Sequence, residues 1–89
     1  MERWRLIVSG RVQGVGYRQA LCQRAQALGL GGWVRNRSDG RVELEAEGCS
    51  HDLEQLRIWC ESGPAGAQVS SVSECMIPLE GHDWFEVRR

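Results

Sequence analysis

The chain has 89 residues, and its 11 basic and 12 acidic side chains leave a formal net charge of −1 at pH 7. That length suits a single domain, residues 1–89, built from two thin layers. The near-neutral charge argues against a nucleic-acid partner, because such proteins neutralise phosphates with a basic surface. No apolar segment approaches the roughly 20 residues that cross a bilayer, and the run "MERWRLIVSG" lacks the long apolar stretch of a signal peptide. We therefore expect a cytoplasmic protein without membrane contact.

The beginning of the chain predicts a strand, a loop and a helix. The β-branched run Arg5–Ser9, "RLIVS", is typical of a central strand. The glycine loop Gly10–Arg18, "GRVQGVGYR", follows it. Apolar side chains then recur at helical spacing, and Gly29 stands where a helix ends in the left-handed conformation. The apolar helical positions are Tyr17, Leu21, Ala25 and Leu28.

Two strand-like runs joined by a turn come next. The first is Gly32–Asn36, "GWVRN", and the second is Arg41–Gly48, "RVELEAEG". A two-residue Asp39-Gly40 turn would place Arg35 and Arg37 on the apolar face, opposite Leu44 and Val42. A three-residue loop, Ser38–Gly40 with Gly40 left-handed, avoids this and is the turn we predict. It pairs Val34 with Leu44, Arg35 with Glu43, and Asn36 with Val42; the apolar residues Val42, Leu44 and Ala46 then alternate with Glu43, Glu45 and Glu47.

The second half of the chain predicts a helix and two strands. Ser50 is the expected N-cap, with acidic side chains in the first turn. Gly63 and Pro64 end this helix. Ala67–Ile77 is the fourth expected strand, and Trp84–Val87 is a short final one. The predicted buried stripe of the helix is Leu53, Leu56 and Cys60, with Trp59 alongside.

This order of elements is the split βαβ pattern and predicts an α+β, ferredoxin-like βαββαβ sandwich. We expect an antiparallel four-stranded sheet, plus the short C-terminal strand, covered on one face by two helices. The first and second strands then run in the same direction, and their carboxyl ends share the edge where ligands of open α/β sheets bind. The glycine loop leaves the first strand there and Asn36 ends the second, so we expect the two to converge.

The glycine loop has features of an anion site. The first turn of a helix carries unpaired N–H groups and a partial positive charge. Gly14 and Gly16 allow close approach of the backbone, and Arg18 offers a planar guanidinium. The loop lacks the Gly-Lys-Ser/Thr of a Walker motif, and Gln19 replaces the third glycine of the dinucleotide fingerprint. By itself, the pattern fits a plain tight turn as well as an anion site.

Three residues allow two interpretations each. Arg18 fits either a solvated helix position or an anion site, and the adjacent loop amides favour the anion. Asn36 fits either a site residue or a turn residue, and the residues alone favour the turn, because asparagine before Ser-Asp-Gly is common there. Tyr17 could pack under the loop or face a ligand, and we favour packing.

The cysteines and histidines show no metal-binding spacing. The four cysteines are spread without a CxxC pair, and neither His51 nor His82 has a cysteine at finger-like spacing. We expect reduced, mostly buried thiols rather than disulfides or zinc ligands. The cysteines are Cys22, Cys49, Cys60 and Cys75.

The ordered strings "GRVQGVGYR", "GWVRN", "DGRVELEAEG", "SGPAGAQVSSV" and "FEVR" resemble the acylphosphatase family over nearly the whole chain. The resemblance implies hydrolysis of the carboxyl-phosphate anhydride of a small acyl phosphate. The products would be a carboxylate and inorganic phosphate, which would also inhibit. It implies no metal and no organic cofactor, and nothing in the chain demands more than a monomer.

The resemblance also implies roles for individual residues. Arg18 would bind the phosphoryl group, and Asn36 would orient the attacking water. The loop amides that share the phosphoryl group would be those of Gln13, Gly14, Val15, Gly16, Tyr17 and Arg18. Arg37 departs from the family pattern, because a small hydroxyl residue often follows the asparagine.

Two other functions fit parts of the pattern. A non-catalytic anion-binding module on the same fold is the main alternative. An RNA-binding domain with the same element order would need paired aromatics on its central strands, and these are not found.

Overall fold

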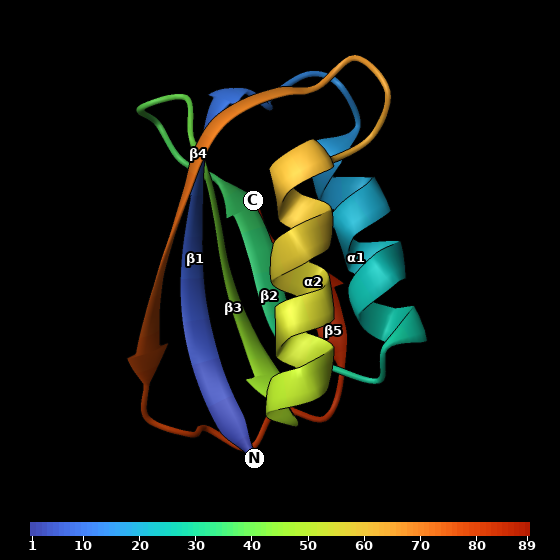
Figure 1. Cartoon of the computed structure of the whole chain (residues 1–89), viewed down its shortest axis with the longest axis vertical. Coiled ribbons are helices and arrows are strands. Elements are labelled where there is room, and N and C mark those ends of the chain that lie inside the picture. Colours follow the sequence, from blue (N-terminus) through green and yellow to red (C-terminus); the bar gives the residue numbers. More distant parts are fainter.

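The computed structural model describes residues 1–89 as a five-stranded sheet with two helices packed on one face (Figure 1). The predicted βαββαβ order with a short C-terminal strand is confirmed. Neither helix combines the length and apolar character needed to cross a bilayer. The strands are β1 (Glu2–Arg11), β2 (Gly31–Asn36), β3 (Val42–Gly48), β4 (Gln68–Ile77) and β5 (Phe85–Val87). The helices are α1 (Tyr17–Ala27) and α2 (Ser50–Ser62).

The strand order is β4-β1-β3-β2-β5. β3 is antiparallel to both β1 and β2, so β1 and β2 run in the same direction, as predicted. β4 is antiparallel to β1, whereas β5 pairs in parallel with β2, so the sheet is mixed rather than antiparallel throughout. The chain leaves β4 at the end of the sheet that lies opposite the glycine loop. It crosses to β2 there, and β5 must therefore run alongside β2 in the same direction (Figure 1).

The predicted three-residue loop, Ser38–Gly40, lies at the centre of the β2–β3 turn, residues 37–41. Gly40 has a φ of 90°, and the Arg37 N–H donates to the Arg41 carbonyl at 2.8 Å, which closes the turn. The predicted register is confirmed: Val34 pairs with Leu44, Arg35 with Glu43 and Asn36 with Val42. This register places the Asn36 side chain on the helix-covered side of the sheet.

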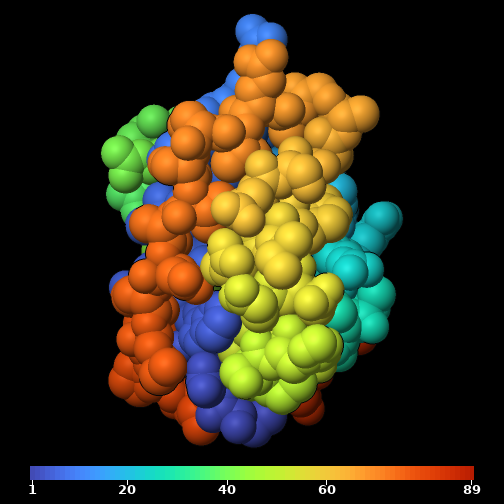
Figure 2. Space-filling view, viewed as in Figure 1, coloured from blue at the N-terminus to red at the C-terminus, as the bar shows by residue number.

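The core lies between the helices and the inner face of the sheet. Alternate residues of β1, β2 and β3 interdigitate with one stripe from each helix, and one cluster results. The predicted α2 stripe of Leu53, Leu56 and Cys60 is confirmed as fully buried. Figure 2 shows α2 beside β4, which lies at the sheet edge and is largely exposed. The buried α1 residues are Tyr17, Leu21, Cys22 and Ala25.

The other face of the sheet carries arginine–glutamate pairs that cover one another. Glu43, Glu45 and Glu47 alternate with the apolar residues of β3 as predicted, yet each is less than 9% exposed. Arg3, with no exposed surface, contacts Glu45 at 2.9 Å and Glu47 at 3.3 Å. Arg5 and Arg35 close over Glu45 and Glu43 at 2.9 and 2.7 Å. The arginines therefore shield the three glutamates from water, while Arg5 and Arg35 themselves stay partly exposed.

α2 begins differently from the prediction. Cys49, not Ser50, is the N-cap: it is extended, and its carbonyl accepts the first helical bond from the Leu53 N–H at 3.0 Å. Ser50 is therefore already helical, and no side chain caps the helix; the Cys49 thiol instead lies 3.0 Å from Asp52.

The four cysteines are unpaired. Cys22 and Cys60 are buried, whereas Cys49 and Cys75 are exposed, so the expectation of mostly buried thiols holds for two of them. Burial raises the pKa of the Cys60 thiol to about 12.

Candidate active site

Two glycines shape the loop between β1 and α1. Gly14 and Gly16 have φ angles of 76° and 77°, which favour glycine, and Gly16 is the N-cap of α1. A Cβ at either position would meet no atom within 4 Å. The backbone conformation, rather than a lack of space, therefore requires glycine here.

The main-chain N–H groups of this loop have no partner in the protein. From Gln13 to Gln19, none makes a well-formed hydrogen bond to a carbonyl, and no side chain caps α1. These donors sit at the positive end of the α1 dipole. The loop therefore offers several convergent donors to a bound anion.

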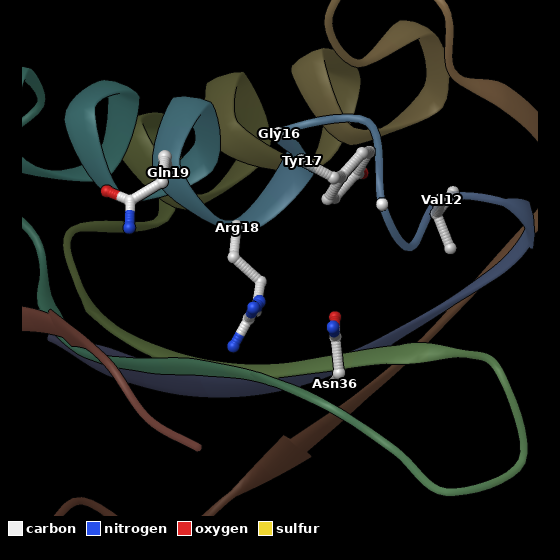
Figure 3. Close-up of a pocket in the computed structure, with 7 residues that line it drawn as sticks. Val12, Gly16, Tyr17, Arg18, Gln19 and Asn36 are labelled. Atoms are coloured by element: carbon white, nitrogen blue, oxygen red, sulfur yellow. The ribbon is translucent and has the colours of Figure 1, made fainter.

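A small pocket of about 90 Å³ opens beside these donors, between the start of α1 and the end of β2 (Figure 3). Five of the predicted site residues meet there, while Gln13 and Val15 do not line it. Val15 packs against the core, and Gln13 turns towards the β2–β3 turn. The lining residues are Val12, Gly14, Gly16, Tyr17, Arg18, Gln19 and Asn36.

Val12 and Gln19 line the pocket without having been predicted. Val12 is an apolar residue that directly follows β1, and Gln19 stands where the dinucleotide motif has its third glycine. Their part in the pocket depends on how the chain folds around it, and no local sequence signal marks either.

Arg18 brings an uncompensated positive charge to the pocket. Its side chain extends from α1 towards the sheet (Figure 3), and no carboxylate lies within ion-pair distance of it. Its one hydrogen bond, from Nη1 to the Arg88 carbonyl, is long at 3.4 Å. The guanidinium therefore remains available to a ligand.

Asn36 faces Arg18 from the opposite wall. Its carboxamide extends from the end of β2 towards α1 (Figure 3). The Oδ1 atom is buried and has no hydrogen-bond donor in the protein. Burying such an acceptor unpaired costs about 1–3 kcal/mol. The atom is therefore placed to accept a hydrogen bond from a molecule that enters the pocket.

Tyr17 packs under the loop, as favoured from the sequence. Only 1% of it is exposed, and its hydroxyl donates to the Cys60 carbonyl at 2.8 Å. Burial raises the pKa of this phenol well above its usual value, so the hydroxyl stays protonated. The ring lies 5.4 Å from that of Trp59. The hydroxyl thus joins the start of α1 to α2 rather than serving the pocket.

The Gln13 side chain makes a contact that the sequence did not indicate. Its Nε2 donates to the Arg37 carbonyl at 2.8 Å and to the Arg41 carbonyl at 2.9 Å. These partners lie 24 and 28 residues further along the chain, so only the folded structure brings them together.

Two further hollows lie on the surface, and the more polar one, of about 380 Å³, is lined by Arg35, Asn36, Arg37, Ser38 and Glu43. The other hollow, of about 260 Å³, lies between Trp4 and the β4 residues Glu74–Met76, and its lining is mostly apolar. No group of three or more His, Cys, Asp or Glu side chains is arranged to hold a metal ion.

The fold and the pocket together define a class: a ferredoxin-like sandwich with free main-chain donors and an unpaired arginine beside the ends of β1 and β2. The family model for acylphosphatase matches residues 4–87. The chain belongs to the acylphosphatase family, whose members are hydrolases acting on acid anhydrides.

Known proteins agree with this assignment. An acylphosphatase of Synechococcus sp. (strain WH7803) is 60% identical over 87 residues, covering 98% of this chain and 87% of the relative. The crystal structure of acylphosphatase from Bacillus subtilis superposes with a TM-score of 0.97 at 40% identity, covering all of both chains. An acylphosphatase structure from Coxiella burnetii gives 0.94 at 40% identity, covering 98% of this chain and 92% of the other.

Proposed function

We propose that this chain hydrolyses the carboxyl-phosphate anhydride of small acyl phosphates, without a metal ion or organic cofactor. The observation that carries the proposal is the buried, unpartnered Oδ1 of Asn36, which shares a pocket with Arg18 and the free loop amides. An oxygen that accepts hydrogen bonds can hold a water molecule, and the cluster of donors opposite it can hold an anion beside that water. The names of the most similar relatives support the substrate class.

The phosphoryl group is held by hydrogen-bond donors. The loop amides from Gln13 to Arg18 and the Arg18 guanidinium donate to its non-bridging oxygens. Because these groups are fixed before the substrate arrives, they stabilise the charge of a loose phosphoryl transition state without reorganising. Arg18 can grip two oxygens at once through its planar fork.

Asn36 places the attacking water. Its Oδ1 accepts a hydrogen bond from the water, which aligns the water oxygen with phosphorus and opposite the departing carboxylate. A bond forms between the water oxygen and phosphorus, and the bond from phosphorus to the acyl oxygen breaks. The carboxylate leaves with the electron pair, and the water's proton passes to a phosphoryl oxygen.

This chemistry needs no side-chain nucleophile or strong base. The residues that line the pocket include no serine, cysteine or histidine. A carboxylate is a good leaving group, so positioning and charge stabilisation supply most of what the reaction requires.

We further propose the setting in which the reaction occurs. Inorganic phosphate is both product and competitive inhibitor, because the same donors bind it. The chain acts as a single domain and a monomer in the cytoplasm, without nucleic-acid or membrane partners.

The test is hydrolysis of benzoyl phosphate by the purified protein in excess EDTA, followed by loss of absorbance. We expect turnover well above the spontaneous rate and unchanged by the chelator. Phosphate binding without turnover would replace the hydrolase with the alternative, a non-catalytic anion-binding module. Activity that disappears with EDTA would refute the metal-free mechanism.

A further inference from the structure

The glycine loop and the end of β2 form two walls of the pocket. No hydrogen bonds of the sheet join these two segments where they face each other. The β1–β3 ladder ends at the Val8–Val42 pair. Beyond it β1 pairs only with β4, after a register shift between Ser9 and Gly10. The glycine loop and the β2–β3 turn, residues 37–41, therefore leave the sheet without main-chain hydrogen bonds between them.

Gln13 bridges this gap. Its two Nε2 hydrogen bonds, at 2.8 and 2.9 Å, reach the carbonyls of Arg37 and Arg41. They use both N–H groups of the carboxamide, and they are the only hydrogen bonds between the glycine loop and the β2–β3 turn. The bridge attaches to a closed turn, because the Arg41 carbonyl also accepts from the Arg37 N–H.

The bridged turn begins one residue after Asn36. We infer that Gln13 is a positioning residue, which fixes the spacing between the Asn36 carboxamide and the main-chain donors of the glycine loop. The inference rests on the proposed hydrolysis, in which one wall holds phosphorus and the other holds the water. A misplacement of about 1 Å between reacting groups costs on the order of 100-fold in rate.

Both the length and the chemistry of glutamine are needed for the bridge. Gln13→Met keeps the length and removes both donors. Gln13→Asn keeps the donors and shortens the side chain by one methylene, which takes them out of reach. Neither substitution alters the main-chain N–H of residue 13, so the proposed phosphate contacts stay in place.

The first measurement separates kcat from phosphate binding. With benzoyl phosphate, we expect both variants to lower kcat by roughly 10- to 100-fold. The inhibition constant for inorganic phosphate should change by only a few-fold, because phosphate needs one wall of the pocket and the transition state needs two. Gln23→Met, on the exposed side of α1, is the matched control and should change neither.

The second measurement is a double-mutant cycle with Asn36→Ala. If Gln13 acts through Asn36, Gln13→Met should lower kcat little or not at all in the Asn36→Ala background. A residue that merely held the fold together would lower kcat by the same factor in both backgrounds.

Each outcome is decisive. An unchanged kcat in Gln13→Met and Gln13→Asn overturns the inference, as does an equal loss in the two backgrounds or a parallel loss of phosphate binding. A wild-type protein without benzoyl phosphate hydrolysis overturns the proposed function instead, and removes the role inferred for Gln13 with it. Thermal unfolding of every variant identifies any that fail to fold, and the other Gln13 variant then decides.

Discussion

Arg18 is a cation in the pocket without an anion of its own. Its one polar contact is the long hydrogen bond to the Arg88 carbonyl, so little competes with an incoming phosphoryl group. Its planar fork can hold two oxygens, whereas a lysine ammonium is a single point of charge. Its role should therefore depend on shape as well as on charge.

We predict that Arg18→Ala abolishes both turnover and inhibition by phosphate. Arg18→Lys should also be severe, with kcat about 100-fold lower or worse, because a point charge cannot replace the fork. Steady-state kinetics with benzoyl phosphate measures both effects. Arg24→Lys, on the exposed surface of α1, is the control and should behave as wild type. Near-normal kcat in Arg18→Lys would show that only the charge matters.

Asn36 differs from Arg18 because its proposed partner is the water. We predict that Asn36→Ala lowers kcat by roughly 100-fold and leaves the inhibition constant for phosphate nearly unchanged. This split is expected because the interaction forms with the attacking water and not with bound phosphate. Inhibition assays and initial rates on one preparation measure both quantities. Unchanged kcat would refute the water-positioning role.

At the scale of elements, Glu47 of β3 holds the segment that follows β4 against the sheet. Glu47 accepts hydrogen bonds from the Glu80 and Gly81 N–H groups at 2.7 and 2.9 Å, and it lies 3.3 Å from Arg3. The N–H of Glu80 above all, together with that of Gly81 and with Arg3, lowers the pKa of Glu47, and burial opposes the effect. This carboxylate ties three separate parts of the chain together.

The direction of this pKa shift predicts how stability depends on pH. Because the folded pKa lies below the ordinary value of 4.5, Glu47 stabilises the fold above that pH, and the contribution is lost as pH falls below it. We predict a lower melting temperature for Glu47→Gln at neutral pH. Its melting temperature should also fall less steeply than that of wild type between neutral pH and acid.

Calorimetry or circular dichroism over a pH series measures this difference. Glu61→Gln, at an exposed position of α2, is the control and should follow the wild-type curve. Parallel curves for Glu47→Gln and wild type would show that Glu47 adds no pH-dependent stability.

At the scale of the whole molecule, charge is unevenly distributed although the net charge is −1. β1, β2 and β5 run in the same direction, so the segments at their carboxyl ends share one end of the molecule (Figure 1). Basic residues outnumber acidic ones in these segments and the pocket: Arg11, Arg18, Arg37, Arg41 and Arg88 lie there together with Asp39, which pairs with Arg37 at 3.0 Å. Acidic residues gather at the other end: Glu2, Asp52, Glu80 and Asp83.

This polarity should attract an anionic substrate to the pocket. We predict that kcat/KM falls several-fold as ionic strength rises from about 10 mM to about 500 mM, because salt screens the attraction, while kcat changes little. Arg11→Gln should lower kcat/KM at low salt, and Arg24→Gln, which removes a charge from the last turn of α1 while the pocket lies at its first turn, should lower it less. A kcat/KM independent of salt would contradict electrostatic steering.

The sequence by itself determined the order of the elements and the register of the central hairpin. Both depend on local patterns: the apolar period of each segment, and the parity that requires a three-residue turn ending at Gly40. The strand–loop–helix junction at Gly14 and Gly16 was equally readable, since a left-handed backbone there favours glycine. These local features are enough to place Arg18 and Asn36 at one edge of the sheet.

Only the tertiary structure decided which side chains meet across that edge. The Gln13 bridge, the pairing of Arg3 and Arg5 with Glu45 and the parallel pairing of β5 all join residues far apart in the chain. The unpartnered state of the Asn36 oxygen is also a property of packing, because it depends on every donor that fails to reach it. Local periodicity specifies which face a residue occupies, but contact partners follow from how complete elements pack against one another.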